Sequence, residues 1–98
     1  MYVILTSKSG QFRTETGDGI EPRETYDYLF YGQRRARFVI AELTRAAKIR
    51  VIDETPPGYV NDIPARLLPK FASLDEARAE LRHLTSYGRI ETALERIA

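Results

Sequence analysis

Between Thr25 and Leu43 the chain concentrates the side chains best suited to recognising another molecule. The aromatic and arginine residues of this stretch are Tyr26, Tyr28, Phe30, Tyr31, Arg34, Arg35 and Arg37. Aromatic rings can stack on nucleic-acid bases while guanidinium groups neutralise phosphates. The same residue types are common at protein interfaces, where a tyrosine presents an apolar ring with a polar tip. The stretch therefore predicts either a protein-facing or a nucleic-acid-facing surface.

Charge is distributed unevenly along the chain, although the net charge is only +1. Residues 15–27 hold five acidic and one basic side chain, whereas residues 34–50 hold six basic and one acidic side chain. The basic set is Arg34, Arg35, Arg37, Arg45, Lys48 and Arg50. Nucleic-acid recognition needs a net basic face, and the neighbouring acidic segment can neutralise this one within the fold. A protein interface is thus favoured over a binding site for RNA or another single-stranded nucleic acid.

The sequence contains no recognisable pattern of catalytic residues. The one histidine, His83, falls nearly opposite the apolar stripe of an expected helix, so it should face solvent without the partner that a general base needs. The lack of cysteine excludes thiolate nucleophiles and cysteine metal ligands. Gly17-Asp18-Gly19 lacks the lysine and hydroxyl of a phosphate loop and is typical of a turn. We expect no cofactor and no metal site, and a small ligand-binding protein or enzyme stays the lesser alternative.

The elements that must position these side chains are mainly β-strands. Residues 2–7 and 11–17 are rich in β-branched and aromatic types and predict a hairpin that turns at Gly10. Residues 37–43 and 48–53 alternate in the same way, and the short link between them predicts a second antiparallel pair.

The strand over 37–43 is apolar on both faces. Val39, Ala41 and Leu43 share one face, and Phe38 and Ile40 share the other. A strand with this pattern is expected in the centre of a sheet with both faces covered.

Two segments allow more than one interpretation. Residues 22–31 fit a helix that starts at Pro22 and stops at Gly32, or a strand that ends in a type II′ turn at Gly32-Gln33. The β-rich composition slightly favours the strand. Residues 89–98 fit a second short helix, with a final strand as the alternative.

One helix is predicted over residues 73–86. Ser73 and Glu76 form a capping box, in which each side chain accepts a hydrogen bond from the amide of the other residue. The apolar stripe that should lie on the sheet is Leu74, Ala77, Leu81 and Leu84. Residues 55–72, before this helix, are proline-rich and predict a loop wrapped over the core.

With 98 residues, the chain is expected to form a single domain over residues 1–98. The expected fold is α+β, with an antiparallel sheet of four or five strands, the capped helix on one face and the proline-rich loop at 55–72. We expect a non-enzymatic, self-associating interaction module, or an accessory subunit of a bacterial-type cytoplasmic complex. No run approaches the roughly 18 apolar residues of a membrane span, so no membrane partner is expected.

Overall fold

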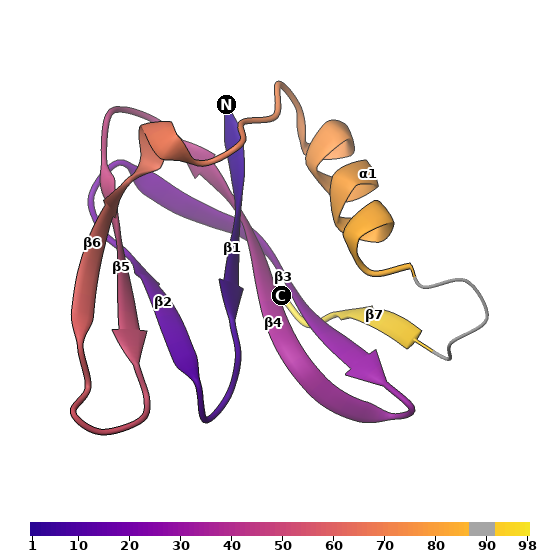
Figure 1. Cartoon of the computed structure of the whole chain (residues 1–98). Coiled ribbons are helices and arrows are strands. Elements are labelled where there is room, and N and C mark those ends of the chain that lie inside the picture. The colour runs from indigo at the N-terminus through magenta and orange to yellow at the C-terminus, as the bar shows by residue number, and fades with distance from the viewer. Residues whose placement is uncertain (87–91) are drawn as a thin grey trace.

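A computed structural model describes residues 1–86 and 92–98 as two antiparallel sheets and one α-helix (Figure 1). The strands are β1 (Tyr2–Ser7), β2 (Phe12–Thr16), β3 (Ile20–Phe30), β4 (Gln33–Leu43), β5 (Lys48–Asp53), β6 (Val60–Pro64) and β7 (Thr92–Arg96), and the helices are η1 (Ala65–Leu67) and α1 (Leu74–Leu84). The first sheet has the order β1-β4-β3-β7 and the second the order β2-β5-β6. The α+β class with antiparallel strands and one capped helix is confirmed, with the strands divided between two sheets.

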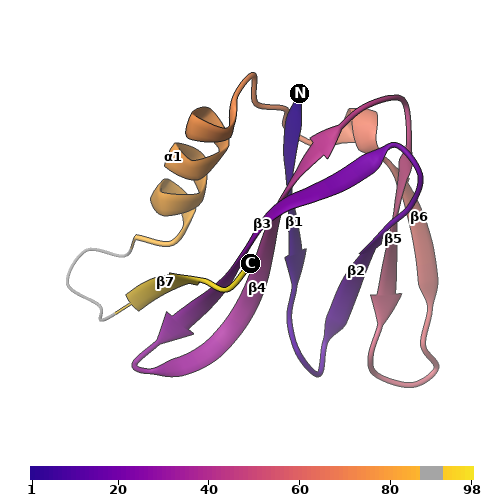
Figure 2. The same cartoon turned by 180° about the vertical axis from the view of Figure 1, so that it is seen from behind.

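The first sheet lies between α1 and the second sheet, as both views of the molecule show (Figures 1 and 2). Val3 and Ala41 face the second sheet in one hydrophobic core, while Ile40 contributes to the other core together with Ala77 and Leu81 of α1. The prediction that residues 37–43 form a strand covered on both faces is therefore confirmed.

The predicted pairing of strands 37–43 and 48–53 is wrong. β4 pairs with β1 and β3, whereas β5 lies in the second sheet between β2 and β6. The link between β4 and β5 crosses from one sheet to the other because β4 needs cover on both faces. Ile49 of β5 supplies part of that cover, buried in the core between the sheets.

Residues 22–30 belong to β3 and Tyr31 lies in the turn that follows, so the favoured strand interpretation of 22–31 is confirmed and the helical one is wrong. β3 pairs with β4 along its length and carries two register shifts. The turn between them is centred on Tyr31 and Gly32, whose φ angles are 51° and 76°. Positive φ at both central residues is the signature of a type I′ turn. The turn thus lies one residue earlier than the predicted type II′ turn, because Phe30 pairs with Gln33.

One strand lies where the sequence patterns predicted a loop, and another lies in a segment with two interpretations. β6 and η1 lie inside residues 55–72, the segment that was expected to be a loop. At the other end of the chain, β7 pairs with β3, so over residues 92–96 the helix is wrong and the alternative, a final strand, is confirmed. Residues 89–91 of the expected terminal helix lie outside the described residues.

Helix α1 begins as predicted, with the Ser73 hydroxyl accepting a hydrogen bond from the Glu76 amide at 3.1 Å. The Glu76 carboxylate accepts from the amide of Ala72, one residue before the predicted partner. Leu81 is fully buried, whereas Leu84 at the end of the stripe is 47% exposed, and His83 faces solvent as expected. No described helix is long and apolar enough to cross a membrane.

Candidate functional site

The residues of the predicted protein interface divide into a buried group and an exposed group. Tyr26 packs against the core beneath α1, and Tyr28 is buried with its ring edge-on to Phe38 at 6.3 Å between centroids. The hairpin tip, which we define as residues 30–35, holds the second group, in which Tyr31, Arg34 and Arg35 are exposed and Phe30 is half-buried. There Tyr31 is 60% exposed.

The hairpin tip forms a small aromatic and cationic cluster. The rings of Phe30 and Tyr31 meet edge to face with centroids 4.7 Å apart. The guanidinium carbon of Arg35 lies 5.7 Å from the centroid of the Phe30 ring, within the range of a cation–π contact. Arg34 and Arg35 have no carboxylate partner in the described part of the chain. These residues are available to a partner molecule.

The structure does not gather the basic set into one face. Three of its members make ion pairs within the chain: Arg37 with Asp27 (Nε to Oδ1, 2.9 Å), Arg45 with Asp18 (Nη2 to Oδ2, 3.8 Å) and Arg50 with Asp62 (Nε to Oδ1, 3.2 Å). Arg34 and Arg35 lie at the hairpin tip, whereas Arg45 and Lys48 lie beyond the opposite end of β4. Strand pairing thus places Arg37 of β4 beside Asp27 of β3, and Arg50 of β5 beside Asp62 of β6.

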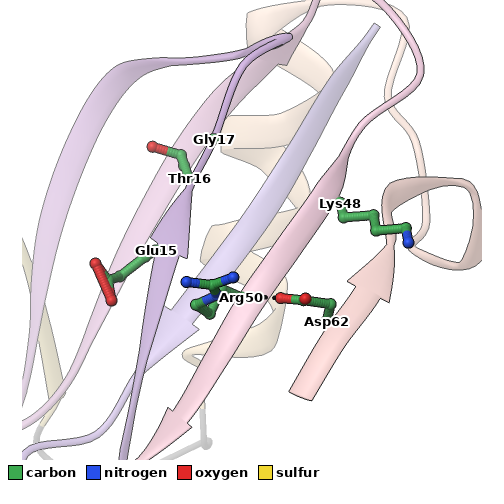
Figure 3. Close-up of a pocket in the computed structure, with 6 residues that line it drawn as sticks. All are labelled: Glu15, Thr16, Gly17, Lys48, Arg50 and Asp62. Atoms are coloured by element: carbon green, nitrogen blue, oxygen red, sulfur yellow. Dashed lines mark hydrogen bonds and ion pairs between the residues drawn. The ribbon is translucent and has the colours of Figure 1, made fainter. Parts of the chain in front are cut away.

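A charged hollow of about 420 Å³ lies against the second sheet (Figure 3). Its lining includes the carboxylates of Glu15 and Asp62 and the cations of Lys48 and Arg50, and the pair Arg50–Asp62 spans neighbouring strands. No nucleophile with an adjacent base lines it. Among the described residues no cluster of metal-ligating side chains occurs either. The two carboxylates and the two cations of this hollow balance in charge.

One carboxylate of the acidic segment 15–27, that of Glu24, lies buried beneath α1. Glu24 is 3% exposed, yet it accepts hydrogen bonds from Arg78 of α1 and from the Tyr26 hydroxyl at 2.6 Å. Arg96 of β7 lies 3.4 Å from its Oε2. The hydrogen bonds from Arg78 lower the pKa of Glu24 to about 2. Burial, and then the bond to Glu24, raise the pKa of Tyr26.

The Glu24 cluster is structural in character. Its carboxylate joins β3 to α1 and to β7, three elements far apart in the sequence. A carboxylate held ionised by two guanidinium groups is a poor general base, because a catalytic pKa near neutral pH is needed for that task. The sequence contains one signal of this burial. Glu24, Tyr26 and Tyr28 occupy every second position of β3 and therefore share one face of the strand, which is the inward face.

The outer edge of β1 is closed at its two ends. At one end, Tyr2 and Phe71 exchange two main-chain hydrogen bonds of 2.8 and 2.9 Å. At the other, Lys8 and Phe12 exchange two bonds of 2.9 and 3.0 Å. In a strand, the main-chain groups of alternate residues face the same edge. The groups of Ile4 and Thr6 therefore face this outer edge, away from β4.

Between these two ends the edge is open. The Thr6 carbonyl accepts a bond from the Thr14 hydroxyl at 2.5 Å. The amide and carbonyl of Ile4 and the amide of Thr6 have no main-chain or side-chain partner on that side within the described residues. We call this stretch the open edge. It presents two donors and one acceptor in the pattern that another strand can bind.

A hollow lies on each side of the open edge. The helix-side hollow, of about 380 Å³, is lined by Ile4, Thr6, Pro69, Phe71, Glu80 and Leu84. The inter-sheet hollow, of about 180 Å³, is lined by side chains of β1, β2, β5 and β6 and by Leu68. Ile4 and Thr6 contribute to both hollows. An unpaired strand edge thus runs between two predominantly apolar recesses.

Comparisons of the chain with protein families, with curated proteins and with solved structures gave no match.

Proposed function

We propose that this protein is a non-enzymatic interaction module that binds an extended segment of a partner protein as an added strand on the open edge of β1. The observation that carries the proposal is the set of unpaired main-chain groups of Ile4 and Thr6 between two apolar hollows. In strand addition, main-chain hydrogen bonds supply affinity and the pockets on alternate sides supply specificity. The open edge offers both.

The closed ends of the edge support a single extended segment as the occupant. Phe71 and Phe12 limit the edge to the two residues that face outwards, Ile4 and Thr6, so the recess takes a segment of about three or four residues. If β1 of a second copy bound there, the rest of that copy's sheet would collide with Phe71 and β2. The self-association predicted from the sequence would therefore use another surface. Sedimentation velocity tests whether the chain self-associates.

The outer strand of the second sheet is a weaker candidate. β6 carries Asp62 and ends at Pro64, and charge and proline on an edge strand both discourage further pairing. The open edge of β1 carries neither.

The experiment is a selection of peptides from a display library of seven-residue sequences, with the full chain as bait. Thr6→Pro removes the outward-facing amide and leaves the bonds to β4 intact, since the Thr6 main chain faces away from β4. Thr6→Val is the matched control, because it keeps the amide and the shape of the side chain. We expect selected peptides to bind the wild type and Thr6→Val and to lose most binding to Thr6→Pro. Peptides that bind Thr6→Pro equally well, or a library without enrichment, would refute strand addition.

Nucleic-acid binding at the hairpin tip is the second candidate. Its support is the exposed ring of Tyr31 together with Arg34 and Arg35, which have no carboxylate partner in residues 1–86 and 92–98. The ion pairs of Arg37, Arg45 and Arg50 count against a wider basic face. Filter binding of a single-stranded RNA across a salt series distinguishes the two proposals, because phosphate contacts weaken steeply as salt rises.

As an interaction module, the protein would act as an accessory subunit of a cytoplasmic complex of bacterial type.

A further inference from the structure

The chemistry of the bound segment follows from the walls of the two hollows, provided that the proposed strand addition is correct. We propose that the partner segment places a large aliphatic side chain in the helix-side hollow and, two residues along on the same face, a lysine or arginine beside Glu80. Side chains of a strand alternate between its faces, so residues two apart point into the same hollow.

The aliphatic position is set by the apolar wall of the helix-side hollow. Ile4, Phe71 and Leu84 line it, and the 47% exposure of Leu84 is unusual for a residue on the apolar stripe of its helix. An inserted leucine or isoleucine would cover this side chain and remove apolar surface from water. The hollow of about 380 Å³ is large enough for such a side chain.

The basic position is set by Glu80. Glu80 is the only charged residue among the described residues that line the helix-side hollow. It makes no ion pair within the described residues. Lys70, in the adjacent segment, points elsewhere, because its Nζ donates to the carbonyls of Arg66 and Leu68. The carboxylate is therefore available to a cation from outside the chain.

The opposite face of the segment meets a smaller space. The inter-sheet hollow has about 180 Å³ and is lined by apolar residues that include Leu5, Ile49 and Val51. Valine, threonine or alanine fits this side better than a large or charged side chain, since a charge there would lose its hydration without a partner. The segment thus alternates small with large or basic residues.

The test uses three acetylated, fluorescein-labelled peptides of seven residues. Each has leucine at its third position and valine or threonine at its second and fourth, and the fifth position is lysine, glutamine or glutamate. Fluorescence anisotropy measures their binding to the wild type, to Glu80→Lys and to Glu95→Lys. The last variant changes the net charge equally at an exposed residue of β7 and is the matched control.

We expect the lysine peptide to bind the wild type about fivefold more tightly than the glutamine peptide, and the glutamate peptide to bind least well. Glu80→Lys should reverse this order, whereas Glu95→Lys should preserve it. An order of affinities that Glu80→Lys leaves unchanged overturns the assignment of Glu80. If none of the three peptides binds at about 1 mM, the proposed sequence pattern is wrong. Library-selected peptides that bind the wild type but not Thr6→Pro would then still support strand addition.

Discussion

The buried Glu24 carboxylate provides a test of how α1 and β7 are held against β3. We consider the substitution Glu24→Gln, which keeps the size and shape of the side chain and removes its charge. The variant leaves Arg78 and Arg96 without the counterion that they share. The substituted side chain would also present an amide group to the two guanidinium groups, and an amide donor cannot replace a carboxylate oxygen there. The expected result is a weaker attachment of α1 and β7 to β3.

The size of the effect follows from the pKa of Glu24 and from the exposure of its partners. A change from the ordinary value of 4.5 to about 2 corresponds to at most about 3 kcal/mol of stabilisation. Arg78 and Arg96 are 33% and 54% exposed, so water partly screens both ion pairs and reduces this figure. We therefore expect Glu24→Gln to lower the free energy of unfolding at neutral pH by about 2 kcal/mol.

The same argument fixes the pH dependence. The pKa of Glu24 is lower in the folded chain than in the unfolded chain, so its contribution is fully present above about pH 5 and is lost as the pH falls towards 2. The difference in stability between the wild type and Glu24→Gln should shrink over that range, because the wild-type carboxylate becomes protonated and uncharged.

Urea unfolding followed by far-ultraviolet circular dichroism at a series of pH values measures both effects. Glu21→Gln is the matched control, since it makes the same change on β3 at an exposed ion pair and should cost less than about 0.5 kcal/mol. Equal stability of Glu24→Gln and the wild type at neutral pH would refute the reasoning. So would a difference that persists unchanged at pH 2.

Further predictions concern the open edge, the hairpin tip and the helix core. In hydrogen exchange, the amides of Ile4 and Thr6 should exchange much faster than that of Leu5, which faces β4, and equal protection of all three would contradict an open edge. Tyr31→Asn should raise the free energy of unfolding by about 0.5 kcal/mol in urea titrations, because asparagine tolerates the positive φ of the turn better than tyrosine; a loss of stability would show that the ring contacts dominate. Leu81→Ala should lower the free energy of unfolding by about 3 kcal/mol, since the Leu81 side chain of α1 is fully buried against the first sheet; a loss below about 1 kcal/mol would count against this packing.

Features that depend on neighbouring residues could be predicted from the sequence. Ser73 and the acidic residues that follow it mark the start of α1. The alternation of Phe38 and Ile40 with Val39 and Ala41 identifies a strand covered on both sides, and the two cores lie on its opposite faces. In each case a few adjacent positions determine the local structure.

Features that depend on which strands meet could not be predicted in this way. A short link after β4 is compatible with a hairpin and with a crossing to another sheet, and nothing local to the link distinguishes them. The burial of Glu24 depends on Arg78, which is distant in the sequence and arrives with α1. In the same way, the sequence around Asp27 and Arg37 shows opposite charges, while only the pairing of β3 with β4 places them in contact.

The open edge itself follows from the way in which β2 leaves β1. The two strands share main-chain hydrogen bonds only at Lys8 and Phe12. At Thr14 the bonds between the two strands involve side chains instead. The Thr14 amide donates to the Ser7 hydroxyl, and the Thr14 hydroxyl donates to the Thr6 carbonyl. Beyond that point β2 pairs with β5 and covers the core between the sheets. The separation that builds the second sheet thus leaves the amide and carbonyl of Ile4 and the amide of Thr6 without a partner on the outer edge of β1, among the described residues. This is the edge to which we propose that a partner segment adds as a strand.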